Sequence, residues 1–127
     1  MSEPVVLLVE DNEENLKLAR DVLEFAGFIV HVATTGEDAL SRASTCSPDL
    51  ILMDLQLPGI DGHTALTHLR ADPATTGIPV VALTAYAMRE DRERALSAGF
   101  DGYLEKPISV RSFPDQVRAY LRSEDDR

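Results

Sequence analysis

The chain has 127 residues, enough for one compact domain, and its composition, 44% hydrophobic and 27% charged, is that of an ordinary globular protein. Its 22 acidic and 12 basic residues give a formal net charge of −10, which repels phosphate backbones and argues against nucleic-acid binding. Cys46 is the only cysteine, which excludes an internal disulfide, and the apolar run after the N-terminus is too short for a signal sequence or a membrane span. We therefore expect a cytoplasmic protein that inserts into no membrane.

The chain begins with an expected strand and helix. The β-branched run Val5–Val9 predicts a strand, and two carboxylates, Glu10 and Asp11, follow it directly. From Asn12 the pattern changes, because apolar residues recur on one helical face until Gly27: Leu16, Ala19, Leu23 and Ala26. Acidic residues next to Asn12 and a glycine at the end are typical of helix termini.

A second strand is expected at residues 28–33, and capping-box patterns in residues 34–38 start a short helix after it. The apolar run 50–53 then predicts a third strand, which ends in Asp54. This run shows no alternation of apolar and polar residues, as is typical of a parallel strand covered on both faces. Ligands of parallel sheets bind outside the carboxyl ends of the strands, which is where Asp54 is expected.

The next part of the chain predicts a helix, a strand and a second, more polar helix. Asp61 is a suitable N-cap for the first of these helices, and Asp72 with the proline after it ends that helix. Residues 78–83 form a further apolar run, which finishes at Thr84. Residues 86–98 favour a helix whose middle is almost entirely charged, so we expect it to be the most solvent-exposed helix of the fold.

The last strand is expected at Gly102–Glu105, and a C-terminal helix follows it. Pro114 would break that helix if it began near residue 110, because a proline inside a helix removes a hydrogen bond and clashes with the preceding turn. We therefore expect a late start, with Ser112 as the cap, Asp115 as its capping partner and Pro114 in the first turn.

Five strands thus alternate with five helices over short connections, which predicts an α/β fold whose parallel sheet carries helices on both faces. A doubly wound sheet with the strand order 2-1-3-4-5 is a common arrangement of this kind. The chain shows no linker, repeat or low-complexity segment, so residues 1–127 are expected to form a single domain with its core at 4–122. The acidic tail at 123–127 is too short for another element and is expected to fray.

Four of the expected strands end in reactive polar residues: Glu10 and Asp11, Asp54, Thr84, and Lys106. Because the first and third strands are neighbours in the expected order, three carboxylates would converge at one edge of the sheet. Such close like charges destabilise one another unless a cation lies between them. An all-oxygen cluster of this kind suits Mg²⁺, with Mn²⁺ as a substitute.

This set of residues contains what phosphoryl transfer to a carboxylate requires: a nucleophile, a metal ion and donors to the phosphoryl oxygens. We interpret Asp54 as the phosphoacceptor and as a metal ligand. The other roles are a direct metal ligand at Asp11, a water-mediated ligand at Glu10, a backbone-carbonyl ligand at Gln56, and contacts to the phosphoryl group from the Thr84 hydroxyl and the Lys106 ammonium.

Taken singly, these residues have simpler roles, namely helix caps, a polar strand end and a solvated charge, and only their joint position at strand ends favours a site. The three histidines, His31, His63 and His68, lack the spacing of metal ligands. A phosphatase of the haloacid dehalogenase type would need a second aspartate where Gln56 stands, and a P-loop enzyme would need a glycine-rich loop after the first strand. The alternative that stays open is an interaction module of the same fold that is not phosphorylated.

The motifs resemble those of response-regulator receiver domains across residues 4–122. The matching pieces are Glu10-Asp11, Asp54 within Leu-Met-Asp-Leu-Gln-Leu-Pro-Gly, Thr84-Ala85 and Lys106-Pro107. Two further stretches, Leu-Thr-Ala-Tyr-Ala-Met and Glu-Lys-Pro-Ile-Ser-Val, resemble single-domain receivers of the DivK kind. The resemblance implies a flavodoxin-like fold with the strand order 2-1-3-4-5. It also implies a phosphoacceptor switch and not an enzyme, which a histidine kinase or phosphotransfer protein phosphorylates on Asp54 with Mg²⁺ and which dephosphorylates itself.

The resemblance also implies a conformational switch and its readers. Tyr103 matches an aromatic residue that rotates when Thr84 moves, and the Lys106–Pro107 bond is expected to be cis. Gln56 and Tyr86 match positions that tune the loss of the phosphoryl group. The surface of the fourth helix, fifth strand and fifth helix would then change for a downstream protein target. No output domain is expected after the last helix.

Overall fold

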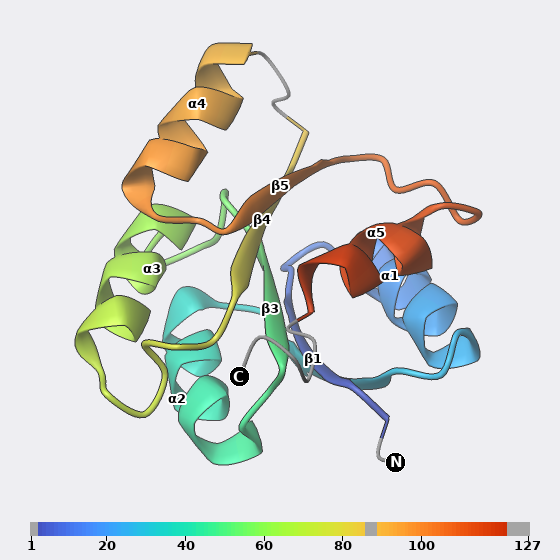
Figure 1. Ribbon diagram of the computed structural model, residues 1–127, viewed down its shortest axis with the longest axis horizontal. Coiled ribbons are helices and arrows are strands. Elements are labelled where there is room, and N and C mark those ends of the chain that lie inside the picture. The colour runs from blue at the N-terminus through green and yellow to red at the C-terminus, as the bar shows by residue number, and fades with distance from the viewer. Residues whose placement is uncertain (1–2, 86–88, 122–127) are drawn as a thin grey trace.

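The computed structural model describes residues 3–85 and 89–121, and within them five strands alternate with five helices (Figure 1). In chain order the elements are β1 Val5–Val9, α1 Glu13–Phe25, β2 Ile29–Ala33, α2 Gly36–Cys46, β3 Leu50–Asp54, α3 Gly62–Ala71, β4 Val80–Thr84, α4 Arg89–Ala98, β5 Gly102–Glu105 and α5 Phe113–Tyr120. This alternation is the one that the sequence predicts.

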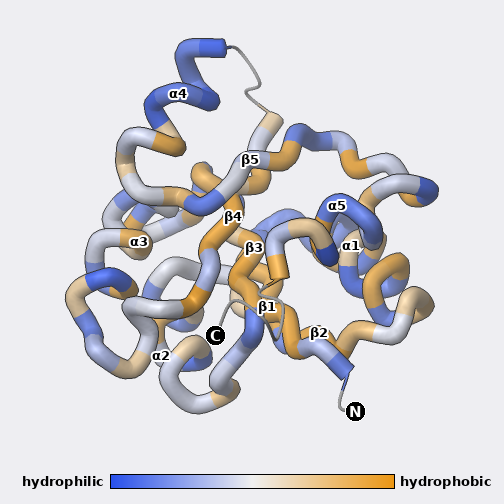
Figure 2. The backbone as a smooth tube through the Cα atoms, viewed as in Figure 1, coloured by the Kyte–Doolittle hydropathy of each residue, from blue (hydrophilic) through white to orange (hydrophobic). Residues whose placement is uncertain are grey.

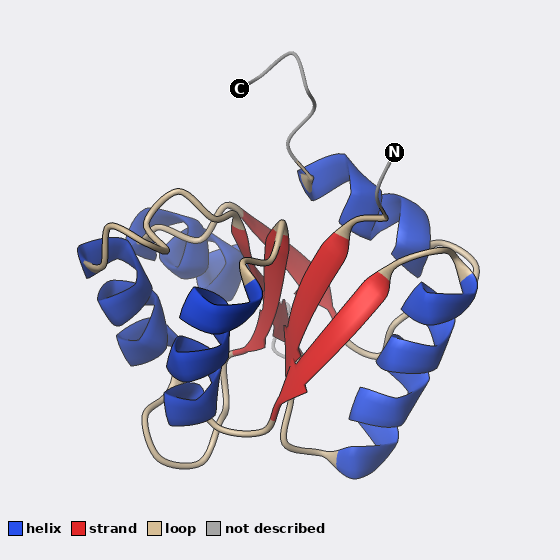
Figure 3. Cartoon of the chain, turned by 90° about the horizontal axis from the view of Figure 1, so that it is seen from below, coloured by secondary structure: helices blue, strands red, loops and turns tan. Residues whose placement is uncertain are grey.

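The strands form one parallel sheet in the order β2-β1-β3-β4-β5, which confirms the predicted flavodoxin-like topology. In its register, Val9 of β1 pairs with Met53 of β3, and Asp54 of β3 pairs with Leu83 of β4. The carboxyl ends of the strands therefore meet at the same edge of the sheet (Figure 3). This edge is where the sequence predicts a functional site.

Helices cover both faces of the sheet (Figure 3). On one face Leu23 of α1 and Val117 of α5 join the apolar cluster, and on the other face α2, α3 and α4 contribute residues such as Ala43, Leu66 and Ala95. Every residue of β3 and β4 is buried, which explains the absence of alternation in their sequences. Figure 2 shows these apolar strands at the centre of the molecule, with more polar helices around them.

Three helices begin with side-chain caps, two of them at the capping signals predicted in residues 34–38 and at Asp61. Asn12 accepts a hydrogen bond from the backbone N–H of Asn15 at 2.9 Å, and Thr35 accepts one from that of Asp38 at 3.0 Å. Asp61 accepts a hydrogen bond from the N–H of Thr64 at 2.8 Å. Each cap stabilises its helix by about 1 kcal/mol and fixes where the preceding loop ends.

The β4 strand starts two residues later than predicted. The N–H of Ile78 donates to the Thr75 carbonyl at 3.0 Å, which closes a turn before the strand, and Pro79 has no N–H to contribute to a ladder. Similarly, β2 starts at Ile29, while Phe28 packs into the core. The apolar runs predicted the strands correctly but extended into the apolar residues that precede them, of which Phe28 is buried and Ile78 and Pro79 are half-buried.

The helix α5 starts late, at Phe113, and holds Pro114 in its first turn, as predicted. The predicted capping pair of Ser112 and Asp115 is wrong, because the Ser112 side chain makes no capping hydrogen bond. Its backbone has the helical angles φ −101° and ψ −16°, whereas a capping residue normally has extended backbone. The turn before the helix begins at Ser109, whose carbonyl accepts from the N–H of Phe113 at 2.8 Å.

Helix α4 is the most exposed of the described helices, as predicted, since Ala95 is its only buried residue. The predicted start of this helix at Tyr86 and the predicted fraying of 123–127 lie outside the described residues. None of the described helices is both long enough and apolar enough to cross a membrane.

Candidate functional site

The polar residues at four strand ends come together at the carboxyl edge of the sheet. The ladder continues past the strands, because the N–H of Glu10 donates to the Ala33 carbonyl at 3.0 Å and the N–H of Lys106 donates to the Thr84 carbonyl at 2.8 Å. These bonds fix the backbone at the point where each functional side chain leaves it. Asp54 lies between them as the last residue of the central strand β3.

Three carboxylates form the acidic cluster that the sequence predicts. Oxygen atoms of Glu10, Asp11 and Asp54 lie within 4.8 Å of one another. Glu10 and Asp54 are buried, whereas Asp11 is exposed. The cluster therefore has a closed inner side and an open outer side, through which an ion or a phosphoryl donor can reach it.

The ammonium of Lys106 lies on the closed side, between the two buried carboxylates. Its Nζ is 2.8 Å from Asp54 Oδ2 and also forms an ion pair with Glu10 Oε1. From the sequence we expect this ammonium to contact a phosphoryl group, and in the structure it pairs with the carboxylates of Glu10 and Asp54. It neutralises carboxylates that would otherwise repel each other in a poorly solvated place.

The pKa values of the site reflect this burial and pairing. Burial raises the pKa of the Glu10 carboxyl, the hydrogen bond from Lys106 opposes the rise, and the adjacent Asp54 adds to it. For Lys106, burial alone would lower the pKa, but hydrogen bonds to Asp54 and Glu10 outweigh it and raise the pKa above its usual value. Lys106 is thus held in its charged form by the carboxylates that it neutralises.

Both oxygens of Asp54 have partners. Oδ2 accepts from Lys106, and Oδ1 accepts from the backbone N–H of Gln56 at 3.0 Å. This second bond fixes the start of the β3–α3 loop, which comprises residues 55–61, against the side chain of Asp54. Glu10 is held in a similar way, since its Oε2 accepts from the N–H of Asn12 at 3.2 Å.

The sequence of this chain matches a known protein family. A family model described as the response regulator receiver domain matches residues 6–118. The chain belongs to this family. Receiver domains act as phosphoacceptor switches.

Curated relatives and solved structures agree with this assignment. The receiver is 44% identical over 116 residues to the polar-differentiation response regulator DivK of Brucella ovis, which covers 91% of this chain and 94% of the relative. A putative response regulator from Chloroflexus aurantiacus superposes with a TM-score of 0.88 at 32% identity, over 94% of this chain and 98% of that one. The receiver domain of a sensor histidine kinase from Pseudomonas aeruginosa superposes with a TM-score of 0.87 at 34% identity, over 96% and 100% of the two chains, and its description includes a magnesium ion in the active-site cleft.

Three of the remaining predicted site residues, Thr84, Pro107 and Tyr103, lie within the described part of the chain. Thr84 is buried at the end of β4, and the Lys106–Pro107 peptide bond is cis, the isomer that the resemblance implies. Tyr103, in β5, is buried rather than exposed, and burial raises the pKa of its hydroxyl, with Asp91 and Glu105 adding to the effect. Tyr86 lies outside the described residues.

Sequence reasoning missed two neighbours of the site. The guanidinium of Arg92 lies over the ring of Tyr103, 5.8 Å from its centroid. His63, one of the three histidines that lack the spacing of metal ligands, meets the ring of Phe100 edge-on at 5.5 Å. It also lines a cavity of about 360 Å³ together with Thr84. No spacing in the sequence indicates either contact, because each joins residues from different elements.

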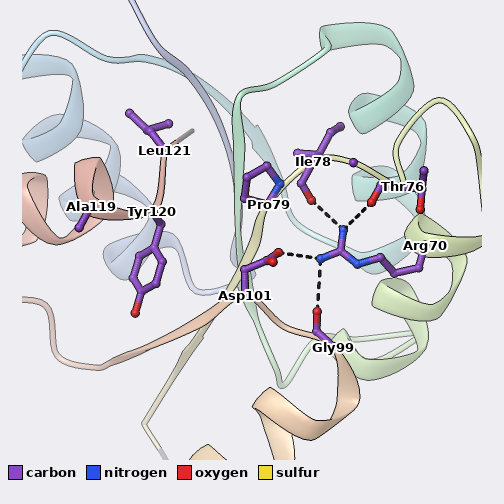
Figure 4. Close-up of a pocket in the computed structure, with 10 residues that line it drawn as sticks. Arg70, Thr76, Ile78, Pro79, Gly99, Asp101, Ala119, Tyr120 and Leu121 are labelled. Atoms are coloured by element: carbon purple, nitrogen blue, oxygen red, sulfur yellow. Dashed lines mark hydrogen bonds and ion pairs between the residues drawn. The ribbon is translucent and has the colours of Figure 1, made fainter. Parts of the chain in front are cut away.

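A second cavity, of about 570 Å³, is lined by Pro79 and Asp101, which directly precede β4 and β5, and so lies at the amino edge of the sheet. Figure 4 shows the residues that line it. Arg70 forms part of its wall, but its guanidinium already donates to the carbonyls of Thr76, Ile78 and Gly99 and pairs with Asp101 at 2.7 Å. With these donors occupied, the arginine ties loops together and is not available to a ligand. The acidic cluster is therefore the better candidate site.

Proposed function

We propose that this receiver accepts a phosphoryl group on Asp54 from a phosphohistidine of a histidine kinase or phosphotransfer protein, in a reaction that depends on Mg²⁺. The observation that carries the proposal is the position of Asp54, a buried carboxylate at the end of the central strand with two further carboxylates within 4.8 Å and an ammonium at 2.8 Å. In the transfer, the P–N bond of the phosphohistidine breaks, a P–O bond to Asp54 forms, and the imidazole leaves.

The donor set fits a magnesium ion. Mg²⁺ prefers carboxylate and carbonyl oxygens and retains several waters, and the exposed side of the cluster leaves room for water. Asp11 and Asp54 would hold the ion directly, Glu10 through a water, and Gln56 through its backbone carbonyl. Mn²⁺ suits the same oxygens. Bound there, the ion would neutralise charge on the phosphoryl oxygens. The magnesium described for the similar receiver from Pseudomonas aeruginosa supports this assignment.

The residues of this chain have distinct parts in the transfer. The Gln56 N–H holds one oxygen of Asp54 and so orients the nucleophile. Lys106 releases Asp54 Oδ2 and moves its charge to the incoming phosphoryl group, because that group brings a stronger negative charge than the carboxylate. The Thr84 hydroxyl donates to another phosphoryl oxygen. Gln56 and Tyr86 tune the later hydrolysis, through which the receiver removes its own phosphoryl group.

Phosphorylation would be read through a surface formed by α4, β5 and α5. When the Thr84 hydroxyl turns to the phosphoryl group, the space beside it changes and Tyr103 repacks, which gives a downstream protein target different contacts in the two states. Kinase or phosphotransfer partners and a protein target are also consistent with the similarity to DivK, a response regulator of polar differentiation.

Intact mass spectrometry after incubation with acetyl phosphate tests the proposal. Wild-type protein should gain one phosphoryl group only with Mg²⁺, and Asp54→Asn should gain none. Asp115→Asn is the matched control, since Asp115 is an exposed aspartate on α5 and should leave the gain unchanged. If neither acetyl phosphate nor a phosphorylated histidine kinase labels the wild type, the protein is an interaction module that is not phosphorylated.

A further inference from the structure

The first turn of α2 packs against the β3–α3 loop at unusually short range. A Cβ atom added to Gly36, the first residue of α2, would collide with Ile60 Cγ1 and lie 2.8 Å from the Ile60 carbonyl oxygen. The neighbouring residues Glu37 and Gly59 also lie close together, because a Cβ added to Gly59 would be 2.7 Å from a carboxylate oxygen of Glu37. Two consecutive residues of the helix therefore touch two consecutive residues of the loop, and Gly36 is buried in the contact.

The loop has few other constraints along its middle. At its ends, the Gln56 N–H donates to Asp54 Oδ1, and the Gly62 N–H donates to the Leu55 carbonyl at 3.2 Å. Between them, residues 57–60 make no hydrogen bond within the described part of the chain, so packing alone sets their position. Leu57 and Ile60 pack partly into the core, and the remaining support comes from α2.

We propose that Gly36 is a positioning residue for the metal site, acting through Ile60 on the β3–α3 loop and so on the backbone carbonyl of Gln56. This role rests on the proposed function, because it requires that the Gln56 carbonyl binds Mg²⁺. A side chain at position 36 must displace Ile60, including its backbone oxygen. Since the loop is only seven residues long and is tied to Asp54 at its start, that displacement moves the Gln56 carbonyl relative to the carboxylates.

Four proteins test this role: wild type, Gly36→Ala, Ile60→Ala and the double variant. Magnesium affinity is measured by isothermal titration calorimetry, and stability by urea denaturation. Gly36→Ala should weaken Mg²⁺ binding by about tenfold, as is typical when a residue that supports a metal ligand is changed. Ile60→Ala removes the side-chain part of this collision and leaves the Ile60 carbonyl oxygen in place, so the double variant should bind Mg²⁺ more tightly than Gly36→Ala alone but less tightly than wild type.

Val117→Ala is the control for a general loss of stability. Val117 is buried in α5, on the other face of the sheet, and its truncation should lower stability while leaving Mg²⁺ affinity unchanged. An unchanged affinity in Gly36→Ala, or a double variant no better than Gly36→Ala, overturns the positioning role.

A readout without metal separates this proposal from the proposed function. In amide NMR spectra of the metal-free protein, Gly36→Ala should shift the Gln56 resonance. In the double variant, this resonance should lie closer to its wild-type position. If wild type binds no Mg²⁺, the proposed function fails and the metal role of Gly36 fails with it, whatever the spectra show. If wild type binds Mg²⁺ and the Gln56 resonance does not move, only the positioning role fails.

Discussion

Lys106 and Asp54 are 52 positions apart in the sequence, yet the ammonium Nζ of one lies 2.8 Å from the carboxylate Oδ2 of the other. The same ammonium pairs with Glu10, so one cation neutralises two buried carboxylates. The site is thus held together before phosphorylation by the group that we assign to the phosphoryl oxygens afterwards. We therefore expect Lys106 to contribute to folding stability as well as to phosphorylation.

Replacing Lys106 with methionine should destabilise the metal-free protein at neutral pH. Removing one partner of a buried ion pair costs about 3–5 kcal/mol, and we expect about 2–3 here because the Lys106 side chain is 15% exposed and water can enter. Saturating Mg²⁺ should recover part of the loss, since it supplies positive charge to the same carboxylates. Urea denaturation with and without Mg²⁺ measures both effects.

The control for this substitution is Lys17→Met, which removes an exposed lysine paired with Asp21 on α1. Exposed pairs of this kind contribute little, so its stability should stay close to that of wild type. Equal stability of Lys106→Met and wild type would mean that the two carboxylates do not need the ammonium.

The contribution of Glu10 to folding stability should depend on pH with the opposite sign to that of most carboxylates. Burial raises the pKa of Glu10, so the folded protein binds this proton at pH values where the unfolded chain has released it. The resulting stabilisation is fully present below the unfolded pKa, about 4.3, and is lost as the pH rises through the folded pKa. Glu10→Gln keeps the neutral form at every pH. Relative to wild type, this variant should therefore become more stable as the pH rises from 5 toward 8 without metal.

Denaturation midpoints of the two proteins across that pH range measure the difference directly. Taking the difference removes the contributions of other carboxylates, such as Asp61, whose pKa is lowered by the backbone N–H of Thr64 that it caps. If the difference instead moves in favour of wild type with rising pH, pairing with Lys106 outweighs the burial of Glu10.

Much of the site could be predicted because it depends on the order of elements. In a parallel sheet the carboxyl ends of the strands lie at one edge, so the polar residues after β1, β3, β4 and β5 had to meet there. The caps at Asn12, Thr35 and Asp61 were also predictable, since a cap bonds to a backbone group only three residues away.

Contacts between elements could not be predicted in this way. The packing of Arg92 on Tyr103 and the short approach of Gly36 to Ile60 depend on how far each helix lies from the sheet and from its loops. The sequence has no period that encodes those distances. Ser112 failed for a related reason: its capping pattern was present, but the preceding turn from Ser109 gave it helical backbone angles.

Arg70 should contribute to stability and not to phosphorylation. Its guanidinium donates hydrogen bonds to three carbonyl oxygens and to Asp101 (Figure 4). These groups lie at the amino edge of the sheet. Arg70→Ala should lower the free energy of unfolding by about 1–3 kcal/mol, because it removes four hydrogen bonds from a charged donor, and among the described residues Asp101 keeps only the N–H of Val80. Arg70→Lys should recover little, since an ammonium cannot reproduce the planar fork. Phosphorylation of Asp54 by acetyl phosphate should keep its wild-type rate, and a large change in that rate would show that the two edges are coupled.

The stability of Tyr103 variants tests whether the Tyr103 hydroxyl lacks a hydrogen-bond partner before phosphorylation. Its hydroxyl is buried, and within the described residues it has no hydrogen-bond partner, an arrangement that costs about 1–3 kcal/mol. Its ring packs in the core and under Arg92, and phenylalanine would keep both contacts. Tyr103→Phe should therefore be as stable as wild type or more stable by about 1 kcal/mol, as measured by urea denaturation without metal. Tyr103→Ala, which removes the ring, should lose about 3–5 kcal/mol. A Tyr103→Phe protein less stable than wild type by 1 kcal/mol or more would mean that the hydroxyl has an acceptor in the unphosphorylated receiver, and that the residue is not free to gain one on activation.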